Sequence, residues 1–111
     1  MTMEPRLHIS EHRVDGRICL DLEGEFSLSS LQDFQDALIE ARSSAPDTID
    51  VDMRRLAFID SQGIGAMLTA WRSFGSGNEG ILFLIRRYSQ PWRALRLTGL
   101  TAHLPIEERD N

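Results

Sequence analysis

The sequence LAFIDSQGIGAMLTAWRSFG, residues 56 to 75, joins an apolar run to a segment with helical spacing. The apolar run ends at the acid and the hydroxyl of Asp60 and Ser61, and the chain then crosses two glycines. From about residue 62 to 74, apolar side chains recur at the i, i+3, i+4, i+7 and i+10 positions of one helical stripe. The stripe consists of Ile64, Met67, Leu68, Trp71 and Phe74. We therefore predict a helix that packs on a sheet and begins directly after an acid and a hydroxyl.

The rest of the sequence alternates between apolar periods of two and 3.6, which is typical of an α/β domain. The predicted strands are residues 6–10, 17–24, 48–53, 80–85 and 103–106, and the predicted helices are residues 28–44, 62–74 and 89–100. The continuous apolar run of five residues after Gly80 indicates a central strand covered on both faces. The order β-β-α-β-α-β-α-β, with right-handed crossovers, predicts a mixed β-sheet of about five strands with α-helices packed against it. Because no long linker separates these segments, residues 1–111 are predicted to form a single domain.

Local signals support several of these boundaries. The Asp15-Gly16 pair supplies the positive φ angles of a tight hairpin turn, so the first two strands are predicted to be antiparallel. Ser29 or Ser30 is predicted to cap the helix that follows, whose apolar stripe is Leu31, Phe34, Leu38 and Ile39. In the last helix, Ser89 is the predicted cap, Pro91 lies in the first turn, and Gly99 ends the helix in the left-handed conformation.

The composition limits the kinds of function. The chain has 12 arginines, no lysine and 17 acids, and its net charge of −5 argues against general attraction to nucleic acid. Nothing near the N-terminus has the form of a signal peptide, and no apolar run approaches the roughly 20 residues that span a bilayer. We therefore predict a cytoplasmic protein without membrane insertion. Cys19 is the only cysteine, so a disulfide framework and a zinc-thiolate cluster are excluded, and we predict a packed thiol.

The common catalytic motifs do not fit. A nucleophile elbow needs a glycine two residues before its serine, where Ile59 stands, so a small hydrolase using Ser61 is a weak alternative. The segment GSGNEG at 75–80 matches a dinucleotide fingerprint in letters only, because it follows a helix and enters a strand. A P-loop is excluded by the lack of lysine. Asp50, Asp52 and Asp60 are interpreted as solvated carboxylates, and no catalytic residue, metal or cofactor is predicted.

Two interpretations of Ser61 remain open on physical grounds. Its hydroxyl can cap the helix by accepting a backbone N–H, a contribution of about 1 kcal/mol. Alternatively, Ser61 is a phosphorylation switch, because a phosphoryl group is favoured by the same N–H groups and by the helix dipole. It changes the surface charge by nearly two units without refolding. Gly63 and Gly65 remove side-chain bulk beside it, which lets a partner approach closely.

The segment FIDSQGIGAML resembles the Asp-Ser-Ser/Thr-Gly-Leu/Ile-Gly segment of the STAS domain, the fold of the bacterial anti-sigma factor antagonists. LEGEFSLSSLQDFQDAL is similar to the second strand and first helix entry of that family, and ALRLTGLTAHLPI to its closing helix and strand. The resemblance covers about residues 7 to 106. Two positions depart from the family pattern: Gln62 stands where a second hydroxyl is common, and Ser27 where an aspartate is common.

The resemblance implies a binding partner and kinase substrate rather than an enzyme. In the family, the serine matching Ser61 is phosphorylated by the anti-sigma factor, which has serine kinase activity. The unphosphorylated antagonist binds that factor and releases a sigma factor, and a serine phosphatase resets the cycle. The alternative is a STAS-type scaffold or interaction subunit of a transporter, lipid-trafficking or sensor complex, in which Ser61 is only a cap.

The predicted partner-binding residues lie where strand exits and helix entries gather at one end of the sheet, and all of them except Gly63 are expected to form one exposed patch. These residues are Phe26, Ser27, Asp60, Ser61, Gln62, Gly63 and Ile64.

Overall fold

The computed structural model of the protein describes residues 7–74 and 80–111. The loop predicted at 75–80 therefore lies outside the described residues except for Gly80, as does the first residue of the strand predicted at 6–10. The strands are β1 (Leu7–Val14), β2 (Arg17–Phe26), β3 (Thr48–Ile59), β4 (Ile81–Arg86) and β5 (Ile106–Arg109). The helices are α1 (Leu31–Ser43), α2 (Ser61–Ser73) and α3 (Gln90–Thr98), with short 3-10 turns η1 (Leu28–Ser30) and η2 (Leu100–Ala102). The predicted order of strands and α-helices is confirmed.

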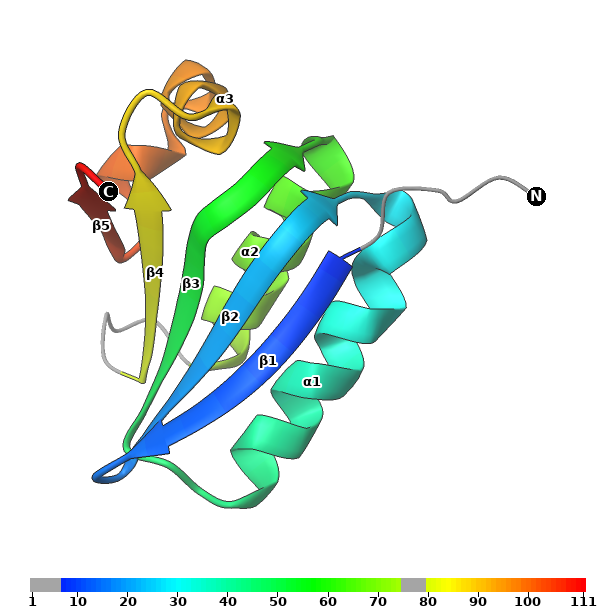
Figure 1. Ribbon diagram of the computed structural model, residues 1–111, viewed down its shortest axis with the longest axis vertical. Helices are drawn as coiled ribbons and strands as arrows, with labels where there is room; N and C mark the ends of the chain where they lie inside the picture. The colour runs from blue at the N-terminus through cyan, green and yellow to red at the C-terminus, as the bar shows by residue number, and fades with distance from the viewer. Residues whose placement is uncertain (1–6, 75–79) are drawn as a thin grey trace.

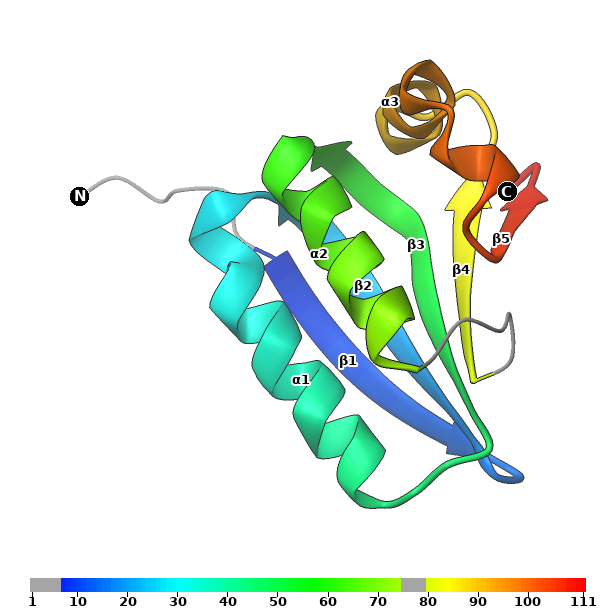
Figure 2. The ribbon, with the colours of Figure 1, turned by 180° about the vertical axis from the view of Figure 1, so that it is seen from behind.

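The strands form one five-stranded sheet in the order β1-β2-β3-β4-β5 (Figure 1). β1 and β2 are antiparallel, and every later pair is parallel, so the predicted mixed sheet is confirmed. Asp15 and Gly16 have φ angles of 46° and 80°, which makes the predicted tight hairpin turn. Helices α1 and α2 lie on the same face of the sheet, and the opposite face carries no helix over its middle (Figures 1 and 2). The crossovers from β2 to β3 and from β3 to β4 have the same hand and advance across the sheet in the same direction, so their helices lie on the same face.

The main core lies between this sheet face and the two helices. β2 and β3 contribute alternate side chains, α1 contributes a stripe, and α2 contributes small and apolar residues. The buried residues of these elements include Ile18, Leu20, Leu22, Ile49, Val51, Met53, Phe34, Leu38, Ala41, Met67 and Ala70. The predicted α2 stripe is confirmed, with Leu68, Trp71 and Phe74 partly buried at its outer end.

The predicted stripe of α1 was wrong at one position. Ile39 is 68% exposed, whereas Ala41 is fully buried. The buried positions Phe34, Leu38 and Ala41 are separated by four and three residues, so they lie on one line along the helix. Ile39 follows Leu38 by one residue, which rotates it about 100° away from that line.

β3 is longer than predicted, and its second half contains two bulges that interrupt the alternation of side chains. The prediction ended it at residue 53, but it continues to Ile59. Where β2 passes from Asp21 to Glu23, β3 passes from Asp52 to Arg55, one residue more. A second extra residue occurs opposite the step from Gly24 to Glu25. Each bulge bends the strand and resets which side chains face the core. Beyond residue 52 the buried positions of β3 are therefore Met53, Leu56 and Ile59, at every third residue.

Other strand boundaries also differ from the predictions. β1 continues to Val14 and β2 to Phe26, each beyond its predicted end. The strand predicted at 103–106 begins only at Ile106, because η2 and a turn occupy the preceding residues. β4 lies between β3 and β5, and its consecutive residues Phe83 and Leu84 are both buried, which agrees with a strand covered on both faces.

Candidate functional site

The candidate site lies where β3 ends and α2 begins. Asp60 is the N-cap of α2, with an extended backbone, and its Oδ1 accepts hydrogen bonds from the N–H groups of Gln62 and Gly63, both at 2.9 Å. Ser61 is the first residue of the helix and is exposed. The interpretation of Ser61 as the cap was therefore wrong. Because β3 runs on to Ile59, the extended conformation that a cap needs falls on Asp60, one residue earlier.

Two other elements hold this junction in place. The Asp60 N–H donates to the Phe26 carbonyl at the end of β2, at 3.2 Å. The side-chain amide of Gln90, in the first turn of α3, makes two hydrogen bonds with the backbone of Ile59: its Oε1 accepts from the N–H at 2.8 Å, and its Nε2 donates to the carbonyl at 3.0 Å. The Gln90 side chain thus makes the backbone hydrogen bonds that a neighbouring strand would make at the end of β3. The sequence carries no signal for this role, because Gln90 follows an ordinary helix cap.

The two glycines of α2 have different environments. A Cβ on Gly63 would lie 2.5 Å from the Phe26 carbonyl oxygen and 2.7 Å from Cγ1 of Ile59, so only glycine allows the first turn to pack this closely. The expectation that Gly63 opens the surface to a partner was wrong, since this residue is buried. A Cβ on Gly65 would meet no described atom within 4 Å. Packing within the described structure therefore does not require glycine at Gly65. That the missing side chain at Gly65 lets a partner approach closely remains a proposal.

The structure brings the predicted site residues together, but it does not expose all of them. Phe26 is fully buried and Ile64 is only 9% exposed, so the prediction of an exposed patch was wrong for these two side chains. The Phe26 ring packs on Phe34, with 4.8 Å between the ring centroids, and the Phe26 carbonyl accepts the Asp60 N–H. Ser61 and Gln62 are exposed, and Ser27 and Asp60 are half-buried.

Two apolar side chains beside these positions escaped the sequence analysis. Leu28, directly after Ser27, is 66% exposed, and Phe58, two residues before Asp60, is 39% exposed. The loop at Ser27 is ordered by Ser30, whose hydroxyl accepts from the Ser27 N–H at 3.0 Å and contacts the Glu25 carbonyl oxygen at 3.1 Å. Ser30, one of the two predicted cap residues, is the residue directly before α1. Its hydroxyl, however, makes no hydrogen bond that caps this helix. The sequence alone does not show that Leu28 and Phe58 remain exposed.

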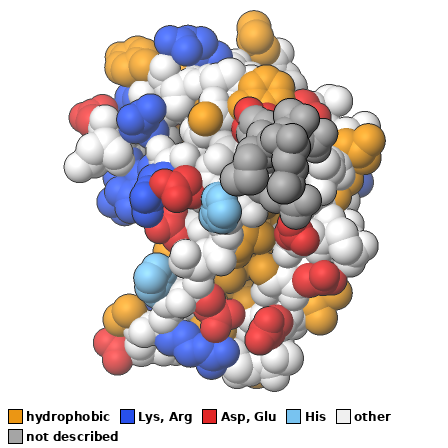
Figure 3. Space-filling view, turned by 45° about the vertical axis from the view of Figure 1, so that its right-hand side comes forward, with side chains coloured by type: hydrophobic (Ala, Val, Ile, Leu, Met, Phe, Trp, Pro, Cys, Tyr) orange, Lys and Arg blue, Asp and Glu red, His pale blue; other side chains and the backbone are white. Residues whose placement is uncertain are grey.

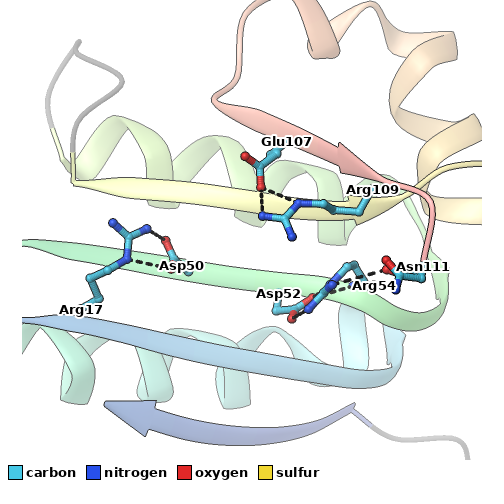
Figure 4. A network of polar contacts seen from close by, with 7 residues as sticks. All are labelled: Arg17, Asp50, Asp52, Arg54, Glu107, Arg109 and Asn111. Atoms are coloured by element: carbon cyan, nitrogen blue, oxygen red, sulfur yellow. Dashed lines mark hydrogen bonds and ion pairs between the residues drawn. The ribbon is translucent and has the colours of Figure 1, made fainter. Parts of the chain in front are cut away.

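The helix-free face of the sheet carries ion pairs (Figure 4). Asp50 pairs with Arg17 at 2.7 Å, and Asp52 pairs with Arg54 at 2.8 Å. Asp52 is only 8% exposed, so the interpretation of this residue as a solvated carboxylate was wrong. Burial raises the pKa of Asp52, but hydrogen bonds from the Arg54 side chain and backbone outweigh that effect and hold the pKa below its ordinary value.

Cys19 lies on β2, partly buried. Burial, with the nearby carboxylates of Asp52, Asp50 and Asp21, raises the pKa of its thiol to about 11. A thiol with such a pKa is protonated at neutral pH and is a poor nucleophile. Within residues 7–74 and 80–111, no group of three or more His, Cys, Asp or Glu side chains is arranged to hold a metal ion. None of the described helices combines the length and apolar character needed to cross a membrane.

Comparison with known families decides the family. A family model described as "Mlab, STAS domain" matches residues 9–105, nearly the whole chain. The chain belongs to the STAS domain family. This assignment agrees with the five-stranded mixed sheet and the three helices described above. No curated protein sequence matches this STAS domain.

Solved structures share the STAS fold at low identity. An anti-sigma factor antagonist from Mycobacterium paratuberculosis is 20% identical, with 90% of this chain and 84% of that chain covered and a TM-score of 0.76. The antagonist SpoIIAA in its unphosphorylated form is 20% identical over 92% and 88%, with a TM-score of 0.70. Bacillus SpoIIAA in the phosphorylated form is 21% identical over 92% and 91%, with a TM-score of 0.63.

A further similar structure is a sulfate transporter family protein from Wolinella succinogenes, 21% identical over 82% of this chain and 75% of that chain, with a TM-score of 0.61. Identities this low show a shared fold alone.

Proposed function

We propose that this STAS domain is an anti-sigma factor antagonist that is switched off by phosphorylation at Ser61. In its unmodified form it binds an anti-sigma factor with serine kinase activity and thereby releases a sigma factor. The kinase phosphorylates Ser61, and a serine phosphatase restores the binding form. The domain is a binding partner and a substrate in this cycle rather than an enzyme.

The exposure of Ser61 on a junction that does not need its hydroxyl is the observation that carries the proposal. Asp60 caps α2, and Gln90, Phe26 and Gly63 fix the turn by contacts that do not involve the Ser61 side chain. A phosphoryl group can therefore be added and removed while the fold is retained. The structures of SpoIIAA in unphosphorylated and phosphorylated forms support the same expectation for a protein of this fold.

The chemistry of the junction explains why phosphorylation would weaken binding. The N–H groups of Gln62 and Gly63 already donate to Asp60, so a phosphate on Ser61 gains the helix dipole but few free donors. It also lies beside the Asp60 carboxylate and stays solvated. A partner that covers this surface must remove water from about two added negative charges, which costs binding free energy.

The surface offered to the partner is small and mixed in character. Ser61 and Gln62 supply exposed polar groups, Ser27 and Asp60 lie half-buried at its edge, and Leu28 adds exposed apolar area. The buried residues Phe26, Gly63 and Ile64 act as positioning residues in this proposal, because they fix the backbone that presents Ser61. A reversible complex requires only an interface of standard size, roughly 800 Å² per partner.

The test is to purify the anti-sigma factor that copurifies with this protein and to measure binding and phosphorylation. With magnesium and ATP, we expect one added phosphate at Ser61, located by mass spectrometry of the digested protein. Ser61→Ala is expected to bind like the parent and to accept no phosphate. Ser61→Asp is expected to bind at least tenfold more weakly, about 1.4 kcal/mol.

Ser10→Ala is the matched control, because Ser10 is an exposed serine on β1. It should bind the partner and accept phosphate like the parent. Phosphate on a serine other than Ser61, or tight binding by Ser61→Asp, contradicts the proposed switch.

A second candidate function is a STAS scaffold or interaction subunit of a transporter, lipid-trafficking or sensor complex. The similar sulfate transporter family protein from Wolinella succinogenes favours it. This candidate predicts that the copurifying partner has no kinase activity and that Ser61→Asp binds it as tightly as the parent. The same two measurements therefore separate the candidates.

A further inference from the structure

A groove lies between β1 and α1, away from the Ser61 junction. It is open to solvent and has a volume of about 360 Å³. The apolar residues that line it are Leu7, Ile9, Leu20 and Ala37, and the acidic ones are Glu11, Asp33, Asp36 and Glu40. Figure 3 shows hydrophobic side chains at the bottom of a hollow on this side of the molecule, with acidic side chains to its right and below it. The groove therefore has an apolar floor and an acidic rim.

One wall of the groove is the open edge of the sheet. β1 is the first strand in the sheet order, and within residues 7–74 and 80–111 it pairs only with β2. The register of this pair runs without a shift through all eight residues from Leu7 to Val14, and β1 contains no proline. In antiparallel pairing, alternate residues of an edge strand direct their N–H and C=O groups away from the neighbouring strand. Such a regular edge can accept another strand, whereas many natural edges are protected by bulges or proline.

The other wall gives the groove its charge. Asp33, Asp36 and Glu40 are spaced by three and four residues, so they lie along one side of α1. Among the described residues, Asp33 and Glu40 have no ion pair, and Asp36 accepts a hydrogen bond only from the amide of Gln32. None of the described residues that line the groove is an arginine or a histidine. The groove thus favours a cation and offers it carboxylate oxygens.

We propose that this groove binds an extended segment of a partner protein, which adds to β1 as a further strand and carries arginine at alternate positions. The backbone of the segment would pair with the open edge of β1. Side chains of an added strand alternate between the two faces of the sheet, so every second one lies on the face that α1 covers. An arginine there can lay its aliphatic stem over Leu7 and Ile9 and bring its guanidinium to the carboxylates of α1.

A second copy of this chain is the less suitable occupant. Pairing of two β1 strands across a twofold axis would bring one acidic rim close to the other. Like charges at such a contact oppose association. A basic segment of another protein has the complementary charge.

The probe is an eight-residue peptide of alternating threonine and arginine, which matches the length of β1. Binding to the full chain is measured by fluorescence anisotropy of the labelled peptide. We expect saturable binding that weakens as salt increases, because the Debye length falls from about 30 Å at 0.01 M to about 8 Å at 0.15 M. A peptide with glutamate in place of arginine should not bind. Equal binding of both peptides overturns the proposal.

Strand addition is tested separately by N-methylation of the peptide backbone. In a strand, alternate N–H groups point to the same side, so methyl groups on all threonine nitrogens or on all arginine nitrogens block opposite sides. We expect one of the two methylated peptides to lose binding and the other to retain it. If both bind like the parent peptide, the segment does not pair with β1 and the proposal fails.

The site is located by matched double variants of the protein. Asp36→Asn/Glu40→Gln removes two rim charges and keeps the side-chain shapes, and we expect it to weaken binding at least tenfold. Asp47→Asn/Asp110→Asn makes the same change in net charge at two residues outside the groove and should bind like the parent. Equal weakening by both variants shows general attraction to an acidic protein and overturns the proposal. A protein that sediments as a dimer and dissociates when peptide is added identifies a second copy as the occupant, which also overturns it.

Discussion

The start of α2 separates two roles that adjacent residues carry. Asp60 closes the N-terminus of the helix through two hydrogen bonds, and Ser61 presents its hydroxyl to solvent. Asp60→Ala should therefore lower the free energy of unfolding by about 1 kcal/mol, the usual contribution of an N-cap. Ser61→Ala should change it by less than about 0.5 kcal/mol, as is usual for surface substitutions. Urea denaturation of both variants checks this. A larger loss of stability for Ser61→Ala than for Asp60→Ala would mean that the serine, not the aspartate, caps α2.

Gly63 and Gly65 allow the same substitution to be compared at two positions of α2. Gly63→Ala forces a methyl group against the Phe26 carbonyl and Ile59, so we expect a loss of about 2 kcal/mol or more. Gly65→Ala meets no described neighbour and should raise stability by up to about 1 kcal/mol through helix propensity. Thermal unfolding of the two variants distinguishes the effects. Equal changes in both variants would contradict the close packing at Gly63.

At the scale of the element, β3 is stabilised on the helix-free face by the pair of Asp52 and Arg54. Arg54→Met leaves a carboxylate with an 11% exposed side chain without its cation, and we expect a loss of about 2 kcal/mol near pH 7. The control is Arg17→Met on the same face, where both partners are more exposed, Arg17 at 49% against 30% for Arg54 and Asp50 at 16%, and it should cost less than about 1 kcal/mol. Urea denaturation of each variant gives these differences.

The same pair has a pH dependence with a defined sign. The folded pKa of Asp52 lies below its ordinary value of 3.8, so the contribution of the pair is present above that value. It is lost as the pH falls through the lower folded pKa. The stability difference between the parent and Arg54→Met should therefore shrink as the pH falls below about 4. A difference that stays constant down to pH 2 would mean that Asp52 is not the group whose charge Arg54 stabilises.

The sequence predicted the elements whose signals are local. The hairpin at Asp15-Gly16 and the left-handed Gly99 at the end of α3 depend on a few adjacent residues, and both are confirmed. The second half of β3 was missed because its two bulges replace the period of two by a spacing of three. The burial of Phe26 and the Gln90 contact with Ile59 were missed because both depend on residues that are distant in sequence.

At the scale of the whole molecule, the two faces of the sheet differ in kind. One face is covered by α1 and α2 and contains the apolar core, and the other is covered largely by paired charges (Figures 1 and 4). A mixed sheet can leave one face to water when its outward side chains are polar and satisfied. The Ser61 junction lies at one end of this sheet, and the acidic groove lies along its β1 edge. The two surfaces could therefore serve different partners.

The strands lie in the sheet in the same order as in the sequence, and each one pairs with the strand that precedes it. During synthesis, the β1–β2 hairpin can form first, and each later crossover then adds one strand to an edge that already exists. No strand has to be inserted between two others, and no early strand must wait for the last residues of the chain. Domains that can grow in this way expose less unpaired strand edge as they leave the ribosome, which lowers the risk of aggregation before synthesis is complete.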